Sequence, residues 1–229
     1  MHIVQYMLYH LKTFRGKTIV HVGAHHGQEL ARYSSLFARK VIWVEANPKT
    51  FETLQANIEE FRSRPPGTLK RLLGIAQTEH VGINALVTEK DGAEYEFYQF
   101  NNGGLSDSVF HLAEGTQFPD LKETGSVLRL NSNKLDTILR QAGQEPSEVD
   151  VLVLDTEGAE LICMKGAKAT LTNVQYIQTE ISTKPVYTGG VLYGELNSWL
   201  YERGFRRCTA IRRSQMNVIF KSKELKRAA

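Results

Sequence analysis

The chain has 229 residues, of which 41% are hydrophobic and 23% are charged, and it carries a formal net charge of +3. This is the ordinary make-up of a globular protein, with enough apolar residues for one large α/β domain or two small ones. Lysine and arginine are spread along the chain apart from two short runs, which a solvated surface explains, so we predict no nucleic-acid binding.

The sequence shows no signal for export or membrane insertion. The first 16 residues lack the charged start and long apolar core of a signal peptide, and no stretch approaches the roughly 18 apolar residues of a membrane span. Cys163 and Cys208 are far apart, which favours a reducing compartment. We therefore predict a cytoplasmic protein without a membrane span or a disulfide.

The first third of the chain alternates between apolar, β-branched runs and amphipathic runs. Apolar residues at helical spacing predict an N-terminal helix over residues 1–16. The next residues predict strands over 18–22, 40–45 and 69–76, separated by helices over 27–39 and 48–61. This rhythm is typical of βαβ units.

Residues 82–130 interrupt this alternation. Two β-rich runs surround the Asp-Gly pair of "KDGA", which predicts a β-hairpin. Residues 101–125 are polar, rich in glycine and weakly patterned, so we expect a long loop with at most a short helix. Because loops this long in a compact domain are usually functional or mobile, the loop is a candidate lid over a bound ligand.

The alternation then resumes. The pattern predicts helices over 134–142, 159–171 and 193–205 and strands over 149–155 and 174–181. The last residues favour two further strands that pair antiparallel at a sheet edge. We predict one α/β domain over residues 1–229, with a mostly parallel sheet and helices on both of its faces.

Ligands of such sheets bind beyond the carboxyl ends of the strands, where the strand order reverses. Acids and glycines are frequent just after the predicted strands, at residues 23–27, 45, 76–77, 155–158 and 180–183. We therefore expect the functional site at this edge of the sheet.

The turn after the first strand, "GAHHG", suits a nucleoside cofactor. Gly23 and Gly27 allow a tight turn and leave bare main chain at the start of a helix. Glu45 ends the next strand, where it is placed to accept hydrogen bonds from ribose hydroxyls. The spacing differs from the G-x-G-x-x-G of nicotinamide sites and favours a cofactor without a pyrophosphate, such as S-adenosylmethionine.

Several blocks of the sequence resemble the FkbM-type S-adenosylmethionine-dependent methyltransferases. They are "VHVGAHHGQE", "VIWVEANP", "LRLNSNKLDTIL", "VDVLVLDTEGAELICMKGA" and the late "YTGGVLYGELNSWLYERGF". The resemblance implies a class I, Rossmann-like methyltransferase fold, with methyl transfer to a hydroxyl of a sugar, glycan or natural-product acceptor. The predicted cofactor-binding residues are Gly23, Ala24, His25, Gly27, Glu45, Ala46, Ala76, Ser106 and Asp155.

One residue departs from the family pattern. His21 stands two residues before Gly23, where the family commonly has Asp. If that Asp holds the amino-acid end of the cofactor, His21 either replaces it through a water or leaves the task to its neighbours. We therefore expect cofactor binding that is weaker than usual in the family.

Four acids are candidate catalytic residues, because O-methylation requires an aligned acceptor oxygen and removal of its proton. Asp155 either binds the cofactor, acts as the base or caps the following helix. Glu157 has no evident capping role, and Glu180 either faces the acceptor or forms an ion pair with Lys184. Asp107 belongs to the candidate lid.

His25 and His26 lie inside the cofactor turn. Imidazole titrates near neutral pH, but this position favours a role as wall or gate over that of a base. No spacing of acids and histidines demands a cation, so we predict a metal-independent reaction.

Two other function classes stay open from the sequence. One is a non-catalytic protein that binds a nucleoside cofactor. The other is an NAD-dependent oxidoreductase, which the chain supports less well because it lacks the third glycine and a Tyr-x-x-x-Lys set. The sequence identifies neither the acceptor nor the oligomeric state.

Overall fold

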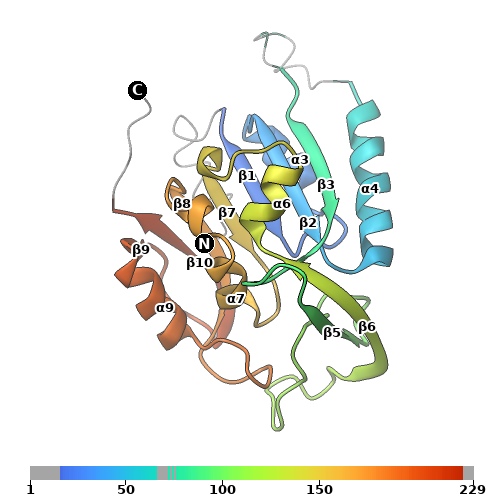
Figure 1. Cartoon of the computed structure of the whole chain (residues 1–229), viewed down its shortest axis with the longest axis vertical. Helices are drawn as coiled ribbons and strands as arrows, with labels where there is room; N and C mark the ends of the chain where they lie inside the picture. The colour runs from blue at the N-terminus through green and yellow to red at the C-terminus, as the bar shows by residue number, and fades with distance from the viewer. Residues whose placement is uncertain (1–15, 66–71, 73, 75, 224–229) are drawn as a thin grey trace.

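The computed structural model describes residues 16–65, 72, 74 and 76–223 (Figure 1). The predicted N-terminal helix falls outside these residues. Within them, seven strands form one sheet in the order β3-β2-β1-β7-β8-β10-β9. These strands are β1 (Thr18–Val22), β2 (Lys40–Glu45), β3 (Glu79–Asn84), β7 (Val151–Leu154), β8 (Tyr176–Ser182), β9 (Phe205–Arg207) and β10 (Gln215–Ser222).

The sheet is parallel from β3 to β8 and antiparallel at its C-terminal edge. β1 pairs in parallel with β2 on one side and with β7 on the other, so the strand order reverses between β1 and β7. β10 pairs antiparallel with both β8 and β9. The predicted α/β fold with an antiparallel C-terminal edge is confirmed.

Helices cover both faces of the sheet. The first two are α3 (Leu30–Ser35) and α4 (Pro48–Ser63), which pack Tyr33 and Leu54 against Val41 and Trp43 of β2 on one face. The opposite face packs against α6 (Leu135–Gln141), α7 (Glu160–Lys165), α8 (Lys168–Leu171) and α9 (Tyr193–Glu202). A 3-10 turn, η1 (Pro146–Glu148), lies between α6 and β7. Every residue of β1 and β7 is buried, which explains why both read as continuous apolar runs.

A second sheet replaces the predicted hairpin. It consists of β4 (Leu86–Val87), β5 (Glu94–Phe100) and β6 (Glu123–Asn133), in the order β4-β6-β5. In Figure 1 it projects from the edge of the main sheet at which β3 ends. The hairpin prediction was wrong because β5 pairs antiparallel with β6, which begins inside the stretch expected to be a loop. The Asp-Gly turn instead forms hydrogen bonds with β6 and with the residue that follows it. The N–H of Gly92 donates to the carbonyl of Ser132, and the N–H of Lys134 donates to the carboxylate of Asp91.

Three other predicted elements were misplaced or too long. The strand that pairs with β2 is β3, ten residues later than the run predicted at 69–76, whose described Leu72 is helical. Helix α3 is short because Phe37, with φ of 58°, leaves the helical conformation. Gly166 ends α7, so the helix predicted over residues 159–171 is divided into α7 and α8. A side chain at Gly166 would collide with the carbonyl of Thr88. No helix in the described part of the chain has the length and apolar character needed to cross a membrane.

Candidate active site

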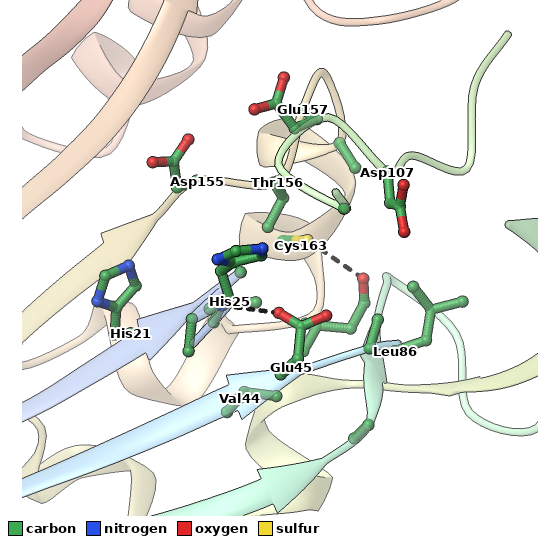
Figure 2. A pocket seen from close by; sticks show the side chains of 18 of the residues that line it. His21, His25, Val44, Glu45, Leu86, Asp107, Asp155, Thr156, Glu157 and Cys163 are labelled. Atoms are coloured by element: carbon green, nitrogen blue, oxygen red, sulfur yellow. Dashed lines mark hydrogen bonds between the residues drawn. The ribbon is translucent and has the colours of Figure 1, made fainter. Parts of the chain in front are cut away.

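The carboxyl ends of β1, β2 and β7 surround a cavity of about 330 Å³ (Figure 2). It lies where the strand order reverses, as expected for a ligand site in this kind of sheet. Its walls include the predicted residues that follow these three strands: Gly23, Ala24, His25, Glu45, Ala46, Asp155 and Glu157. Its volume is sufficient for a small-molecule ligand.

Gly23 joins the three strand ends tightly. Its backbone has φ of +76°, and an added Cβ would lie 2.7 Å from the carbonyl carbon of Asp155 and closer still to the oxygen. The N–H groups of Gly23 and Ala24 both donate to the carbonyl of Val44, at 2.9 and 3.1 Å. Only glycine fits this position, and it leaves the main chain of the turn open to the cavity.

Gly27, the second glycine of the turn, packs against a helix. It is not among the described residues that line the cavity. Its φ is +74°, and an added Cβ would lie 2.7 Å from Cδ1 of Leu54. Gly27 therefore lets the turn pack against α4, and its predicted contact with a cofactor finds no support in the cavity.

Glu45 is buried, with 7% of its surface exposed, and both of its oxygens are oriented by backbone groups. Oε2 accepts from the N–H of His25 and Oε1 from that of Asn47, each at 2.9 Å. Burial raises the pKa of this carboxyl, while the two amide hydrogen bonds oppose the shift. Since each oxygen has a second lone pair, Glu45 can accept two further hydrogen bonds from a ligand.

His25 connects the cofactor turn to a segment far away in the sequence. Its backbone is left-handed, with φ of 45°. Its Nε2–H donates to the carbonyl of Gly103 at 3.1 Å, and its Nδ1 accepts from the side-chain amide of Gln28 at 2.7 Å. Residues 101–108, here called the lid segment, also line the cavity through Gly104, Leu105 and Asp107.

Asp107 holds the lid segment in place. Its Oδ2 accepts from the side-chain amide of Asn47 at 3.0 Å and its Oδ1 from the N–H of Phe100 at 2.9 Å. Both oxygens are engaged in a buried position, so Asp107 fixes the lid segment beside the cavity, and its predicted catalytic role stays a prediction. The neighbouring Ser106 lines a second cavity, described below, and not this one.

Ala76 was predicted to bind the cofactor from the end of a strand, and the structure does not give it that position. It precedes β3, and therefore lies before the start of that strand instead of after its end, where it is exposed. Ala85 and Leu86, which follow β3, line the cavity in its place. The error follows directly from the misplaced third strand.

Three acids gather at the ends of β7 and β8. Carboxylate oxygens of Asp155, Glu157 and Glu180 all lie within 4.8 Å of one another. Burial is the main cause that raises the pKa of Asp155 to about 7, with repulsion from Glu160 adding to it. Burial followed by repulsion from Asp155 likewise raises the pKa of Glu180 to about 8, and burial with repulsion from Glu180 raises that of Glu157.

The contacts of these acids exclude two of the alternatives left by the sequence. Asp155 does not cap the following helix, because Glu160 accepts from the N–H groups of Thr156 and Gly158, at 3.1 and 3.3 Å. Glu180 accepts from the side-chain amide of Gln215 at 2.8 Å, and no ion pair among the described residues joins it to Lys184.

The acid cluster offers two kinds of chemistry. A carboxylate with a raised pKa can accept a proton from an acceptor group near neutral pH. The same three oxygens could hold a divalent cation, since carboxylates are the ligands that magnesium and calcium prefer. Metal independence therefore stays a prediction that needs a direct test.

Sequence reasoning missed several residues of the site. Tyr187 donates its hydroxyl to Oε2 of Glu157 at 2.6 Å, although its segment "YTGGVL" was recognised only as part of a block that resembles the family. The buried thiol of Cys163 lines the cavity and donates to the carbonyl of Val87 at 3.1 Å. Within the helical pattern of residues 159–171, no local signal marks Cys163 as a cavity residue. His21 also lines the cavity, with its Nδ1 3.3 Å from the hydroxyl of Tyr33.

Comparison with known proteins agrees with this architecture. Residues 21–207 match the model of the methyltransferase FkbM domain. The chain is 25% identical over 173 residues to the 2-O-methyltransferase NoeI of Sinorhizobium fredii, covering 75% of this chain and 65% of that protein. The chain thus spans less than two thirds of the length of this curated relative.

A solved structure of the FkbM type shows the same fold. The methyltransferase FkbM from Methylobacillus flagellatus superposes with a TM-score of 0.55 and 14% identity, over 90% of this chain and 43% of that one. A precorrin-6y C5,15-methyltransferase from Geobacter metallireducens gives 0.49 and 12%, over 96% and 87%. With the family model covering most of its length, the chain belongs to the FkbM methyltransferase family.

Proposed function

We propose that this protein transfers a methyl group from S-adenosylmethionine to a hydroxyl of a sugar, glycan or natural-product acceptor. The observation that carries the proposal is the division of one cavity into two sides. Glu45 forms a nucleoside-binding side, and Asp155 and Glu157 face it across the cavity. The turn at Gly23 joins the two sides, because it bonds to Val44 and packs against Asp155. The name of the relative NoeI, a 2-O-methyltransferase, supports a hydroxyl as the acceptor group.

The residues of the cavity fit the cofactor. Gly23 lines the cavity without a side chain, which supports close approach of a ligand to the main chain of the turn. Glu45 presents two oxygens that are already oriented by backbone N–H groups and can bind both hydroxyls of a ribose. Leu86 and Val87 offer an apolar surface for the adenine ring of the cofactor. When bound, the cofactor supplies an electrophilic methyl group on a positively charged sulfur.

The acid cluster supplies the proton acceptor. One of its three carboxylates removes the proton of the acceptor hydroxyl, and a pKa of about 7 for Asp155 suits a base that works near neutral pH. The hydrogen bond from Tyr187 fixes one oxygen of Glu157 and orients the carboxylate between the strand ends. The cluster's negative charge also favours a cationic cofactor in the cavity.

Calorimetric titration with S-adenosylmethionine and, separately, with NAD tests the cofactor assignment. We expect binding of the first alone. Formation of S-adenosylhomocysteine with a panel of hydroxylated acceptors then tests transfer. Binding of the cofactor without transfer to any acceptor would favour a non-catalytic binding protein, and binding of NAD alone would contradict the proposal.

A further inference from the structure

A second cavity of about 480 Å³ adjoins the first. Side chains with amides and aromatic rings make up half of its lining residues: Asn101, Asn102, Gln117, Phe118, Tyr187 and Gln215. We propose that this cavity binds the uncharged, hydroxyl-rich body of the acceptor and disfavours phosphorylated acceptors. The inference rests on the proposed function and adds to it a place and a charge preference for the acceptor.

Glu157 connects the two cavities, because it lines both of them. In Figure 2 it lies on the opposite side of the first cavity from Glu45. Tyr187, which lines the second cavity, donates its hydroxyl to Glu157. A molecule in the second cavity therefore reaches the acid cluster from the side away from the ribose-binding carboxylate.

The amides of the second cavity are held in fixed orientations. Asn101 donates to the carbonyl of Asp120 at 2.9 Å and accepts from the N–H of Lys122 at 3.0 Å. Gln117 accepts from the hydroxyl of Ser214, and Gln215 donates to Glu180. A primary amide has two N–H groups and two lone pairs, so each retains donors or acceptors for ligand hydroxyls.

Phe118 adds an apolar surface beside these amides. Its side chain is 38% exposed although it is a large hydrophobic residue, so packing in the core does not explain its position. An aromatic ring on the wall of a polar cavity suits a ligand with both apolar faces and hydroxyl groups, as a sugar ring has. The combination of oriented amides and an exposed ring therefore matches a carbohydrate-like body.

The charge of the wall argues against phosphate. Among the described residues that line the second cavity, the acidic side chains are Asp120 and Glu157, and none is Lys, Arg or His. Facing like charges oppose the binding of an anion. Arg212 and Arg213 are exposed on the turn before β10 and do not line the cavity, but they lie close in sequence to its lining residue Gln215. They are therefore cations to replace when the binding of a phosphorylated acceptor is tested.

Ligand-observed saturation-transfer NMR on the full chain tests this inference. The probes are methyl glycosides of neutral hexoses and 6-deoxyhexoses, with glucose 6-phosphate as the charged counterpart. We expect binding of neutral glycosides and binding of the phosphate that is about tenfold weaker or undetectable. Phe118→Ala and Gln117→Ala should each weaken glycoside binding by about tenfold, which is about 1.4 kcal/mol. Both variants should keep the calorimetric affinity for S-adenosylmethionine.

Tyr201→Ala provides a matched control, because Tyr201 is an aromatic residue, 57% exposed, on α9 and outside both cavities. The inference is overturned if neutral glycosides fail to bind, or if both cavity variants bind them as well as the native chain does. It is also overturned if glucose 6-phosphate binds more tightly than the neutral glycosides and loses that affinity in Arg212→Ala or Arg213→Ala. If the native chain does not bind S-adenosylmethionine, that result contradicts the proposed function, so the two failures are distinguishable.

Discussion

Replacing Gly23 by Ala tests whether close packing of the strand ends builds the cofactor site. A non-glycine residue at φ of +76° costs about 1–2 kcal/mol. The added Cβ also collides with the backbone of Asp155, which cannot move without displacing β7, and overpacking of this kind costs about 1–3 kcal/mol. We therefore expect Gly23→Ala to lower the free energy of unfolding by about 2–5 kcal/mol.

Gly92→Ala is the matched control. Gly92 has φ of +70°, but nothing lies within 4 Å of the position that its Cβ would occupy. It should therefore lose only the conformational cost of about 1–2 kcal/mol. Denaturant-induced unfolding of both variants gives the two free energies, and calorimetry gives their affinity for S-adenosylmethionine. We expect the cofactor affinity to fall in Gly23→Ala and to stay unchanged in Gly92→Ala.

Equal losses of stability in the two variants would refute this reasoning. They would mean that the ends of β1 and β7 separate at little cost and that the turn is not shaped by Asp155. Unchanged cofactor affinity in a folded Gly23→Ala variant would remove the turn from the binding site.

The remaining predictions concern the acids of the cavity. Glu45→Gln should weaken S-adenosylmethionine binding by about 1–3 kcal/mol in calorimetry, because charged hydrogen bonds are lost, and an unchanged affinity would rule out the ribose assignment. Asp155→Asn should reduce turnover far more than thermal stability, and a parallel loss of both would point to a structural role. Asp155 and Glu180 have raised pKa values of about 7 and 8 in the folded chain. As the pH rises, the unfolded chain therefore loses these two protons at a lower pH than the folded chain does. The free energy of unfolding should fall as pH rises from about 4 to 8 and then level off. Glu180→Gln should flatten this fall in thermal unfolding, and a native stability that rises over the same range would contradict the pKa assignment. Treatment with a chelator should leave activity intact, whereas a loss that magnesium restores would place a cation on the acid cluster.

The parts of the site that the sequence predicted are those with strong local patterns. β1, β2 and β7 are buried and mostly apolar, and Glu45 ends β2 while Gly23 and Asp155 directly follow β1 and β7. A parallel sheet brings the ends of such strands to one edge, so their positions follow from the strand assignment alone. The same logic failed for Ala76 because the strand assignment before it was wrong.

The region between β3 and α6 could not be predicted in the same way. β6 alternates weakly between buried and exposed residues, and it pairs with two strands that precede it in the sequence. Pairing over such distances leaves no local signal, and the "KDGA" turn suggested a simple hairpin. The second cavity is built in part from the stretch before β6, so residues such as Gln117 and Phe118 emerge only from the folded chain.

Both ring nitrogens of His25 are engaged in hydrogen bonds. A carbonyl can only accept, so Nε2–H donates to Gly103, while Nδ1 accepts from the side-chain N–H of Gln28. With the lid segment in this position, neither nitrogen is left open to a substrate. His25 therefore couples the cofactor turn to the lid segment, and under the proposed function the proton of the acceptor goes to the carboxylates on the other side of the cavity.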